Sequence, residues 1–193
     1  MAKENRPRIF QGGRDMTLSM VFIVVLMLIV VVPTGLINLK TGEPDPGTVR
    51  AIDEQAFLDL EARGADFPIV SPVAPAEWTA NSARRTQVDG EPASVVGWVT
   101  EEEGYLQLTQ TGVGVEDAVR GVDAYPRELS GTETIEGREV QKYESTERDV
   151  RDLWVADTGQ TRLLVSGVAT EEDFRQLMDA ALSAEPIDVS DSR

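Results

Sequence analysis

The longest hydrophobic run of the chain lies near its N-terminus, between Asp15 and Lys40. About 24 residues there carry no charge, and Val, Ile, Leu, Met and Phe predominate. Because a bilayer core of roughly 30 Å needs about 20 helical residues to cross it, the run predicts a transmembrane helix over residues 16–39. A cleavable signal peptide has a shorter apolar core and a small-residue cleavage site, and no Ala-x-Ala pattern follows here. We therefore expect the helix to remain as an anchor, and cleavage is the less favoured alternative.

Positive charges flank this span unequally. Four Lys and Arg residues precede it, at positions 3, 6, 8 and 14, whereas Lys40 alone follows it directly. An excess of Lys and Arg marks the cytoplasmic side of a membrane helix. We therefore expect a single-pass protein of the cytoplasmic membrane, with residues 1–15 in the cytoplasm and the C-terminal domain outside it.

The remaining chain divides by composition into three parts. Residues 40–49 are rich in Gly, Pro and acidic residues, which is typical of a linker. The region from 50 to 185 has regular hydrophobic patterns and the length of one domain. Periodicity is lost from Pro186, so residues 186–193 are predicted to form a flexible tail.

Most of the predicted domain alternates between apolar and polar positions or carries β-branched runs, as strands do. Acidic and glycine-containing turns join some of these runs, so two β-hairpins are expected. One short helix or turn is expected after the first hairpin. The predicted strands cover residues 78–88, 93–100, 105–111, 137–145, 151–157 and 160–168, and the short helix or turn covers residues 114–122.

Longer helices are predicted at both ends of the domain. Asp53 can cap the first helix, which carries Ala56, Phe57 and Leu60 on one side. Thr170 and Asp173 have the spacing of a capping box at the start of the last helix. Strands between two packed helices predict an α+β domain with a mainly antiparallel sheet covered by helices. The apolar stripe of the last helix consists of Phe174, Leu177, Met178, Ala181 and Leu182.

The composition excludes several kinds of chemistry. The chain has no His and no Cys, which rules out a Ser-His-Asp triad, a thiol nucleophile, disulfides and the usual zinc sites. Carboxylate, Lys and Tyr chemistry remains, but no phosphate-binding or calcium-binding motif is present. We therefore predict no catalytic residue, no cofactor, no metal site and no enzymatic activity, although a pair of carboxylates across a cleft stays open as a chance arrangement.

The net charge of the predicted domain disfavours some classes of binding partner. From Thr41 onward there are 13 Lys and Arg residues against 32 Asp and Glu residues, a net charge of −19. Such a domain repels nucleic-acid phosphates and anionic lipid headgroups. Solubility is the simplest interpretation of this acidity, and a role in binding calcium or another cation is the alternative.

Several charged residues stand out but favour ordinary roles. Arg84 and Arg85 are adjacent in a predicted strand, so their side chains point to opposite faces and cannot clamp one anion together. We expect them to pair with neighbouring carboxylates. Glu101, Glu102 and Glu103 lie at a predicted hairpin turn and are expected to be solvated rather than to bind a cation.

The aromatic and polar residues of the predicted strands can also be interpreted either as structural residues or as a binding site. Trp78, Trp98 and Trp154 are expected to be core residues rather than a ligand platform. Tyr105, Gln107 and Thr109 share one strand face, which we expect to be an exposed polar surface rather than a partner site.

A set of spaced residues also precedes the last helix. It consists of Pro72, Pro75, Trp78, Ser82, Gly97, Tyr105, Gln110 and Gly167. Together with the N-terminal span, this arrangement resembles an actinobacterial family of single-pass membrane proteins, the domain-of-unknown-function family 4245. The resemblance covers nearly the whole chain and implies a cell envelope and one membrane-tethered domain. The family carries no assigned catalytic residue, so the resemblance implies no activity.

These observations favour attachment over catalysis. We expect a non-catalytic accessory or interaction subunit of an actinobacterial membrane or envelope assembly, a membrane protein complex of which the respiratory chain supercomplex is the first candidate. A free-standing extracytoplasmic module that binds or senses a ligand is the alternative. A deep apolar pocket with convergent polar groups would favour the module, and an exposed apolar patch would favour the subunit.

Overall fold

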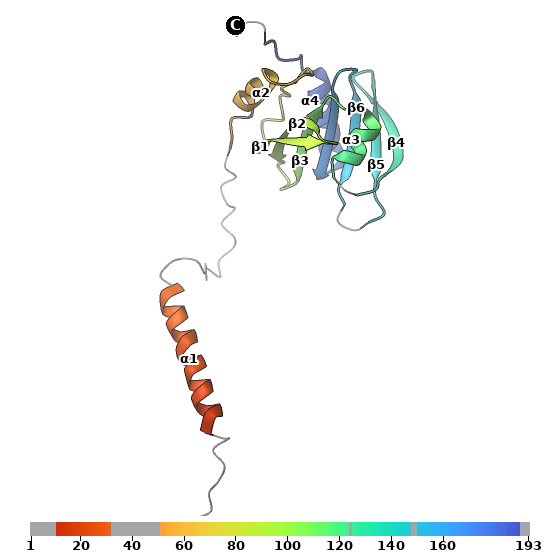
Figure 1. Ribbon diagram of the computed structural model, residues 1–193. Coiled ribbons are helices and arrows are strands. Elements are labelled where there is room, and N and C mark those ends of the chain that lie inside the picture. Colours follow the sequence, from red (N-terminus) through yellow and green to blue (C-terminus); the bar gives the residue numbers. More distant parts are fainter. Residues whose placement is uncertain (1–10, 32–50, 124, 148–149, 190–193) are drawn as a thin grey trace, which may run out of the picture. The chain divides into compact units, whose positions relative to one another are not determined.

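The computed structural model describes residues 11–31, 51–123, 125–147 and 150–189, and the chain divides into two units (Figure 1). The first unit spans Met1–Gly47 and the second spans Thr48–Arg193. Within the described residues, the first unit contributes one helix, and the second contributes seven strands and three helices.

Helix α1, Gln11–Val31, covers the first part of the predicted membrane span. Its described apolar side chains are exposed, from 47% at Val24 to 77% at Met16. Among the residues that the structure describes, no helix combines the length and the apolar character needed to cross a membrane. The rest of the predicted span, residues 32–39, lies outside the described residues, as do residues 1–10 and the predicted linker at 40–49.

The second unit is built on one seven-stranded sheet in which every neighbouring pair of strands is antiparallel. The strand order is β1-β2-β3-β7-β6-β5-β4. The prediction of an α+β domain with an antiparallel sheet is therefore confirmed, and both expected hairpins, β2–β3 and β6–β7, are present. The strands are β1 Thr79–Val88, β2 Glu91–Val99, β3 Tyr105–Thr111, β4 Glu128–Ile135, β5 Arg138–Glu144, β6 Asp152–Asp157 and β7 Arg162–Val168.

Helices cover both faces of the sheet, and Figure 1 shows α3 in front of it and α4 behind it. Helices α2, Glu54–Ala62, and α4, Glu171–Ser183, pack on one face, over the larger hydrophobic core. The shorter α3, Val115–Gly121, covers part of the other face, over a second core that includes Leu153, Val155 and Leu164. Side chains alternate along each strand, so Leu106 and Leu108 of β3 enter the first core.

Helix α2 starts as predicted, but two of the three apolar residues expected on one side do not face the core. The Asp53 carboxylate accepts a hydrogen bond from the Ala56 backbone N–H at 2.9 Å, which caps the first turn. Leu58 is fully buried, whereas Ala56 is exposed and Leu60 is 62% exposed. Apolar residues lie all around this nine-residue helix, so its sequence alone does not define which side faces the core.

Helix α4 has the predicted start and the predicted apolar stripe. The Asp173 backbone N–H donates to the Thr170 hydroxyl, and the Thr170 backbone N–H donates to the Asp173 carboxylate, which completes the capping box. Phe174, Leu177 and Met178 are buried against the sheet.

The segment between α2 and β1 is fixed to the end of the sheet. The Gln110 side chain accepts from the Val70 N–H and donates to the Val70 carbonyl, both at 2.8 Å. Ile187 donates its backbone N–H to the Ile69 carbonyl at 2.8 Å, so the part of the predicted tail nearest α4 pairs with this segment. Residues 190–193 of that tail lie outside the described residues.

The two edge strands, β1 and β4, share an irregularity. The register of β1 against β2 shifts between Ala80 and Ser82, and the register of β4 against β5 shifts between Leu129 and Gly131. Each shift is a β-bulge, which increases the local twist of a strand. On the outer side of β1, the Ile52 backbone N–H also donates to the Ala80 carbonyl at 3.0 Å.

Candidate binding cavity

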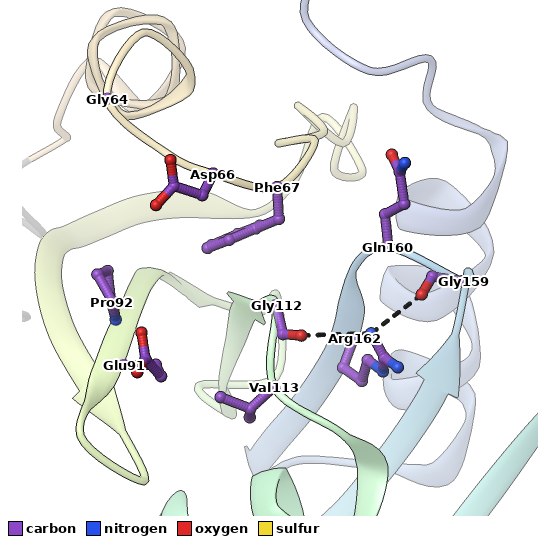
Figure 2. A pocket seen from close by; sticks show the side chains of 10 residues that line it. All are labelled: Gly64, Asp66, Phe67, Glu91, Pro92, Gly112, Val113, Gly159, Gln160 and Arg162. Carbon is purple, nitrogen blue, oxygen red and sulfur yellow. Dashed lines mark hydrogen bonds between the residues drawn. The ribbon is translucent and has the colours of Figure 1, made fainter.

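A cavity of about 620 Å³ opens at one end of the sheet, where four separate segments meet (Figure 2). The strand register explains the meeting, because Ala93 of β2 lies opposite Thr111 of β3, and Thr111 lies opposite Arg162 of β7. The size is within the usual range for ligand sites. The lining residues are Gly64, Asp66, Phe67, Glu91, Pro92, Gly112, Val113, Gly159, Gln160 and Arg162.

Phe67 provides the aromatic surface of this cavity. Its segment is held in place because the Thr161 hydroxyl donates to the Pro68 carbonyl at 2.6 Å, next to the Gln110 contact described above. Gly112 lies against the ring: a Cβ atom added to it would be 3.2 Å from Phe67 Cδ1. The absence of a side chain at Gly112 therefore allows the ring to lie close to the loop after β3.

Arg162 fixes the opposite side of the cavity. Its side chain is 15% exposed, and its Nη1 donates to the carbonyls of Gly159, at 3.1 Å, and Gly112, at 3.4 Å (Figure 2). Its Nε lies 3.4 Å from the Asp157 carboxylate, an ion pair without hydrogen-bond alignment. Arg162 thus ties the loop after β3 to the β6–β7 turn, and its charge is partly balanced by Asp157.

Two carboxylates line the side of the cavity near Phe67. Asp66 and Glu91 are both exposed, and Figure 2 shows the Phe67 ring between them in that view. Within the described part of the chain, neither side chain forms an ion pair or a side-chain hydrogen bond. Glu61, by contrast, accepts two hydrogen bonds from Arg85, each at 2.8 Å.

The chemistry open to this cavity is limited. None of its lining residues carries a hydroxyl, amine, thiol or imidazole group, so the carboxylates of Asp66 and Glu91 are its only potential nucleophiles or bases. No cluster of three or more potential metal-ligating side chains occurs among the residues that the structure describes. The lining thus combines an aromatic ring, two carboxylates and one arginine whose Nη1 already donates to two backbone carbonyls.

The structure places Arg84 and Arg85 on opposite faces of β1, as expected. Arg85 pairs with the Glu61 carboxylate of α2, which is the expected ion pair. Arg84 differs from the expectation, because its Nη2 donates to the Gln107 side-chain oxygen at 3.2 Å rather than to a carboxylate.

The residues Tyr105, Gln107 and Thr109 share a face of β3 as predicted, but this face is less exposed than expected. Thr109 is buried, and Gln107 donates to the Ser166 hydroxyl at 3.1 Å. The Tyr105 hydroxyl lies 3.0 Å from the Ser82 hydroxyl. The polar groups of this face are therefore largely paired with one another.

The other sequence candidates have the ordinary roles that were expected for them. Trp98 and Trp154 are buried, at 1% and 5% exposure, and Trp78 is partly buried against the same core. Glu101, Glu102 and Glu103 are exposed in the β2–β3 turn.

A second charged cluster lies where α4 crosses β4 and β5. The Glu133 carboxylate accepts from Arg175 at 2.8 Å and lies 2.8 Å from Lys142 Nζ. These bonds, from Arg175 first and then Lys142, lower the pKa of Glu133 to about 2 against the opposing effect of burial. Lys142 also lies 4.0 Å from the centre of the Trp154 ring and pairs with Glu171 of α4. The cluster therefore holds α4 to the sheet, and we assign it no binding role.

Sequence reasoning did not identify the cavity. Asp66 and Glu91 are separated by a whole strand, and Arg162 lies far from both in the chain, so only the folded sheet brings these segments together. Each residue type is common in exposed loops, and no spacing in the sequence marks them as a set.

Comparison with known families gives one match that spans most of the chain. A family model described as "Protein of unknown function (DUF4245)" matches residues 8–181. The chain belongs to the DUF4245 family. This match includes all of α1 and extends through most of α4, so the family covers both units. No curated protein and no solved structure matches the chain.

Proposed function

We propose that this DUF4245 protein is a non-catalytic accessory subunit, anchored in an actinobacterial membrane, that docks on a larger membrane or envelope assembly. The chemistry of the cavity carries the proposal. Its exposed carboxylates and aromatic ring present a recognition surface, and the domain that bears it has a high negative charge. Such a surface can select and orient a partner of opposite charge.

The anchor is the second part of the proposal. The uncharged run at residues 16–39 continues beyond the end of α1 at Val31, and a helix over this whole run would have the length of a membrane span. The excess of Lys and Arg before it supports an N-terminus in the cytoplasm and the domain outside. The family match from residue 8 onward supports a common role for the anchor and the domain.

The respiratory chain supercomplex is the assembly to test first. Its electron carriers move at the outer surface of the membrane, where the acidic domain would be placed, and an acidic surface can steer a basic carrier domain.

To test the proposal, a tagged copy of the protein would be purified in mild detergent, and the proteins that co-purify in stoichiometric amounts would be identified. Recovery of a defined membrane complex is expected. Recovery of the protein alone, under conditions that keep known complexes intact, would contradict the proposal.

A free-standing ligand-binding module is the second candidate, and the 620 Å³ cavity favours it. The cavity is open rather than deep, because most of its lining residues, including Asp66, Glu91 and Gln160, are exposed. Apolar side chains are also exposed on the domain, Val73 at 88% and Leu60 at 62%. We therefore propose the docking subunit first and keep the ligand-binding module as the alternative.

A further inference from the structure

We propose that the cavity lined by Asp66, Phe67 and Glu91 receives a Lys or Arg side chain from a basic segment of the partner protein. This inference rests on the docking function proposed above and names the chemistry by which docking occurs. The three residues are called the cation pocket below.

Three features of the cation pocket suit a positively charged side chain. The carboxylates of Asp66 and Glu91 are exposed, and among the described residues neither of them forms an ion pair. Phe67 is partly exposed and lines the cavity, and the face of an aromatic ring attracts Lys and Arg cations within about 6 Å. Pro92 and Val113 add apolar surface for the methylene groups of a long side chain.

An anionic ligand is disfavoured by the way Arg162 is held. Its Nη1 points to two backbone carbonyls, and its Nε lies beside the Asp157 carboxylate, so its guanidinium is not presented as a free fork. An anion would also approach a domain in which 32 acidic residues outnumber 13 basic ones from Thr41 onward. Charge therefore favours a cation over a carboxylate or phosphate.

The position of the cation pocket suits a side chain from a protein surface. Its rim is formed by exposed residues of separate loops, including Gly64, Gly112 and Gly159, which have no side chains to obstruct an approaching backbone. The volume of about 620 Å³ is larger than one Lys or Arg side chain needs, so neighbouring residues of a docked segment can also enter.

The test uses the full chain in detergent micelles and saturation-transfer NMR, which detects weak ligands. The probes are acetyl-Gly-Arg-Gly-amide and the same peptide with citrulline, which has nearly the same shape without the charge. We expect the arginine peptide to bind, and the citrulline peptide to bind at least several-fold more weakly. Equal binding of the two peptides would overturn the proposal.

Matched variants locate the binding. Asp66→Asn with Glu91→Gln should weaken binding of the arginine peptide several-fold. Glu101→Gln with Glu102→Gln removes the same charge from the β2–β3 turn, at the other end of β2, and should leave binding nearly unchanged. If both double variants weaken binding equally, the effect is general electrostatic attraction and the cation pocket is rejected.

Phe67→Leu separates the aromatic contribution from the carboxylates. It keeps an apolar side chain but removes the π-face, and we expect affinity to fall by about 2- to 30-fold, as the usual range of cation–π energies predicts. Unchanged affinity in this variant would overturn the role of the ring.

Ethylguanidinium serves as a small-cation probe. If it binds as tightly as the peptide, the pocket is a small-molecule site and the partner assignment fails.

Failure of this inference can be distinguished from failure of the docking function. Purification of the tagged Asp66→Asn/Glu91→Gln variant should lose the companions that the wild-type protein retains. If the companions remain with the variant, the protein is a docking subunit that uses another surface. If the wild-type protein has no companions, the proposed function itself fails.

Discussion

Glu133 connects three elements through its single carboxylate, because it lies on β4 and contacts Lys142 of β5 and Arg175 of α4. Hydrogen bonds from Arg175 and Lys142 lower its pKa to about 2. A carboxylate whose pKa is lower in the folded state than in the unfolded chain stabilises the fold above its ordinary pKa, and this contribution is lost as the pH falls toward the folded value.

The Glu133→Gln substitution should therefore flatten the pH dependence of stability between about pH 5 and pH 2. The lost contribution at neutral pH is expected to be about 1–3 kcal/mol, since one pKa unit corresponds to about 1.4 kcal/mol and solvent screening reduces the full value. Urea unfolding, followed by tryptophan fluorescence at several pH values, would measure it. Glu128→Gln, at an exposed position of the same strand, is the control. The same pH dependence in the Glu133→Gln variant and the wild-type protein would contradict this expectation.

Two strand glycines should respond very differently to a methyl group. A Cβ added to Gly167 would lie 2.0 Å from the Tyr105 carbonyl oxygen and 2.9 Å from Leu106 Cα, both backbone atoms of the adjacent strand. Gly131 of β4 has no atom within 4 Å of the same position. Gly167→Ala should therefore force β3 and β7 apart and cost about 1–3 kcal/mol or more. Gly131→Ala should change stability by less than about 0.5 kcal/mol. Equal melting temperatures for the two variants would show that the sheet can absorb the contact at Gly167.

At the scale of single elements, α4 provides most of the cover for the larger core. Leu177 of α4 is fully buried, whereas Gln176, the preceding residue, is exposed. Leu177→Asp removes a packed side chain and buries a charge without a partner, so it should cost at least about 4 kcal/mol. Gln176→Asp places the same residue on the solvent side and should cost little. Urea unfolding of both variants tests the difference, and similar midpoints would show that α4 does not stabilise the domain.

A helix or strand can be predicted from the sequence when its pattern of apolar and polar residues fits only one structure. The Thr170–Asp173 capping box and the apolar stripe after it define α4 almost completely, because cap and periodicity agree. Strand β4 was not predicted, since Ile135 is its only buried residue and its sequence, ELSGTETI, is polar at most positions. In α2, apolar residues on several sides made Leu60 as plausible an inner residue as Leu58.

The cavity illustrates a second reason for incomplete prediction. Asp66 and Phe67 reach it only because Gln110 and Thr161 hold their segment against the end of the sheet. Hydrogen bonds between residues so far apart in the chain leave no periodic signal in a single sequence. The sequence could therefore predict the fold class, the ion pair of Arg85 and the core position of Trp98. It could not predict which loops meet around Phe67.

At the scale of the whole molecule, the proposed topology can be tested directly. Lys and Arg residues cluster before the apolar run, so we expect the N-terminus to face the cytoplasm and the domain to face outward. External protease added to spheroplasts should digest the domain and leave a small anchored fragment, while a cytoplasmic marker protein stays intact. Full protection of the domain in cells with an intact marker would contradict this orientation.

If the protein is anchored in a membrane as proposed above, the bulges in β1 and β4 have a further consequence. Copies held in a layer collide often, and the outer edge of a sheet can pair with the edge of another copy and begin a polymer. In this domain both outer strands are locally twisted by their bulges, at Asn81 and at Ser130. The Ile52 backbone N–H also donates a hydrogen bond to a backbone carbonyl of β1. Neither edge presents a long, flat row of backbone groups, so neighbouring copies can crowd together without joining into one continuous sheet.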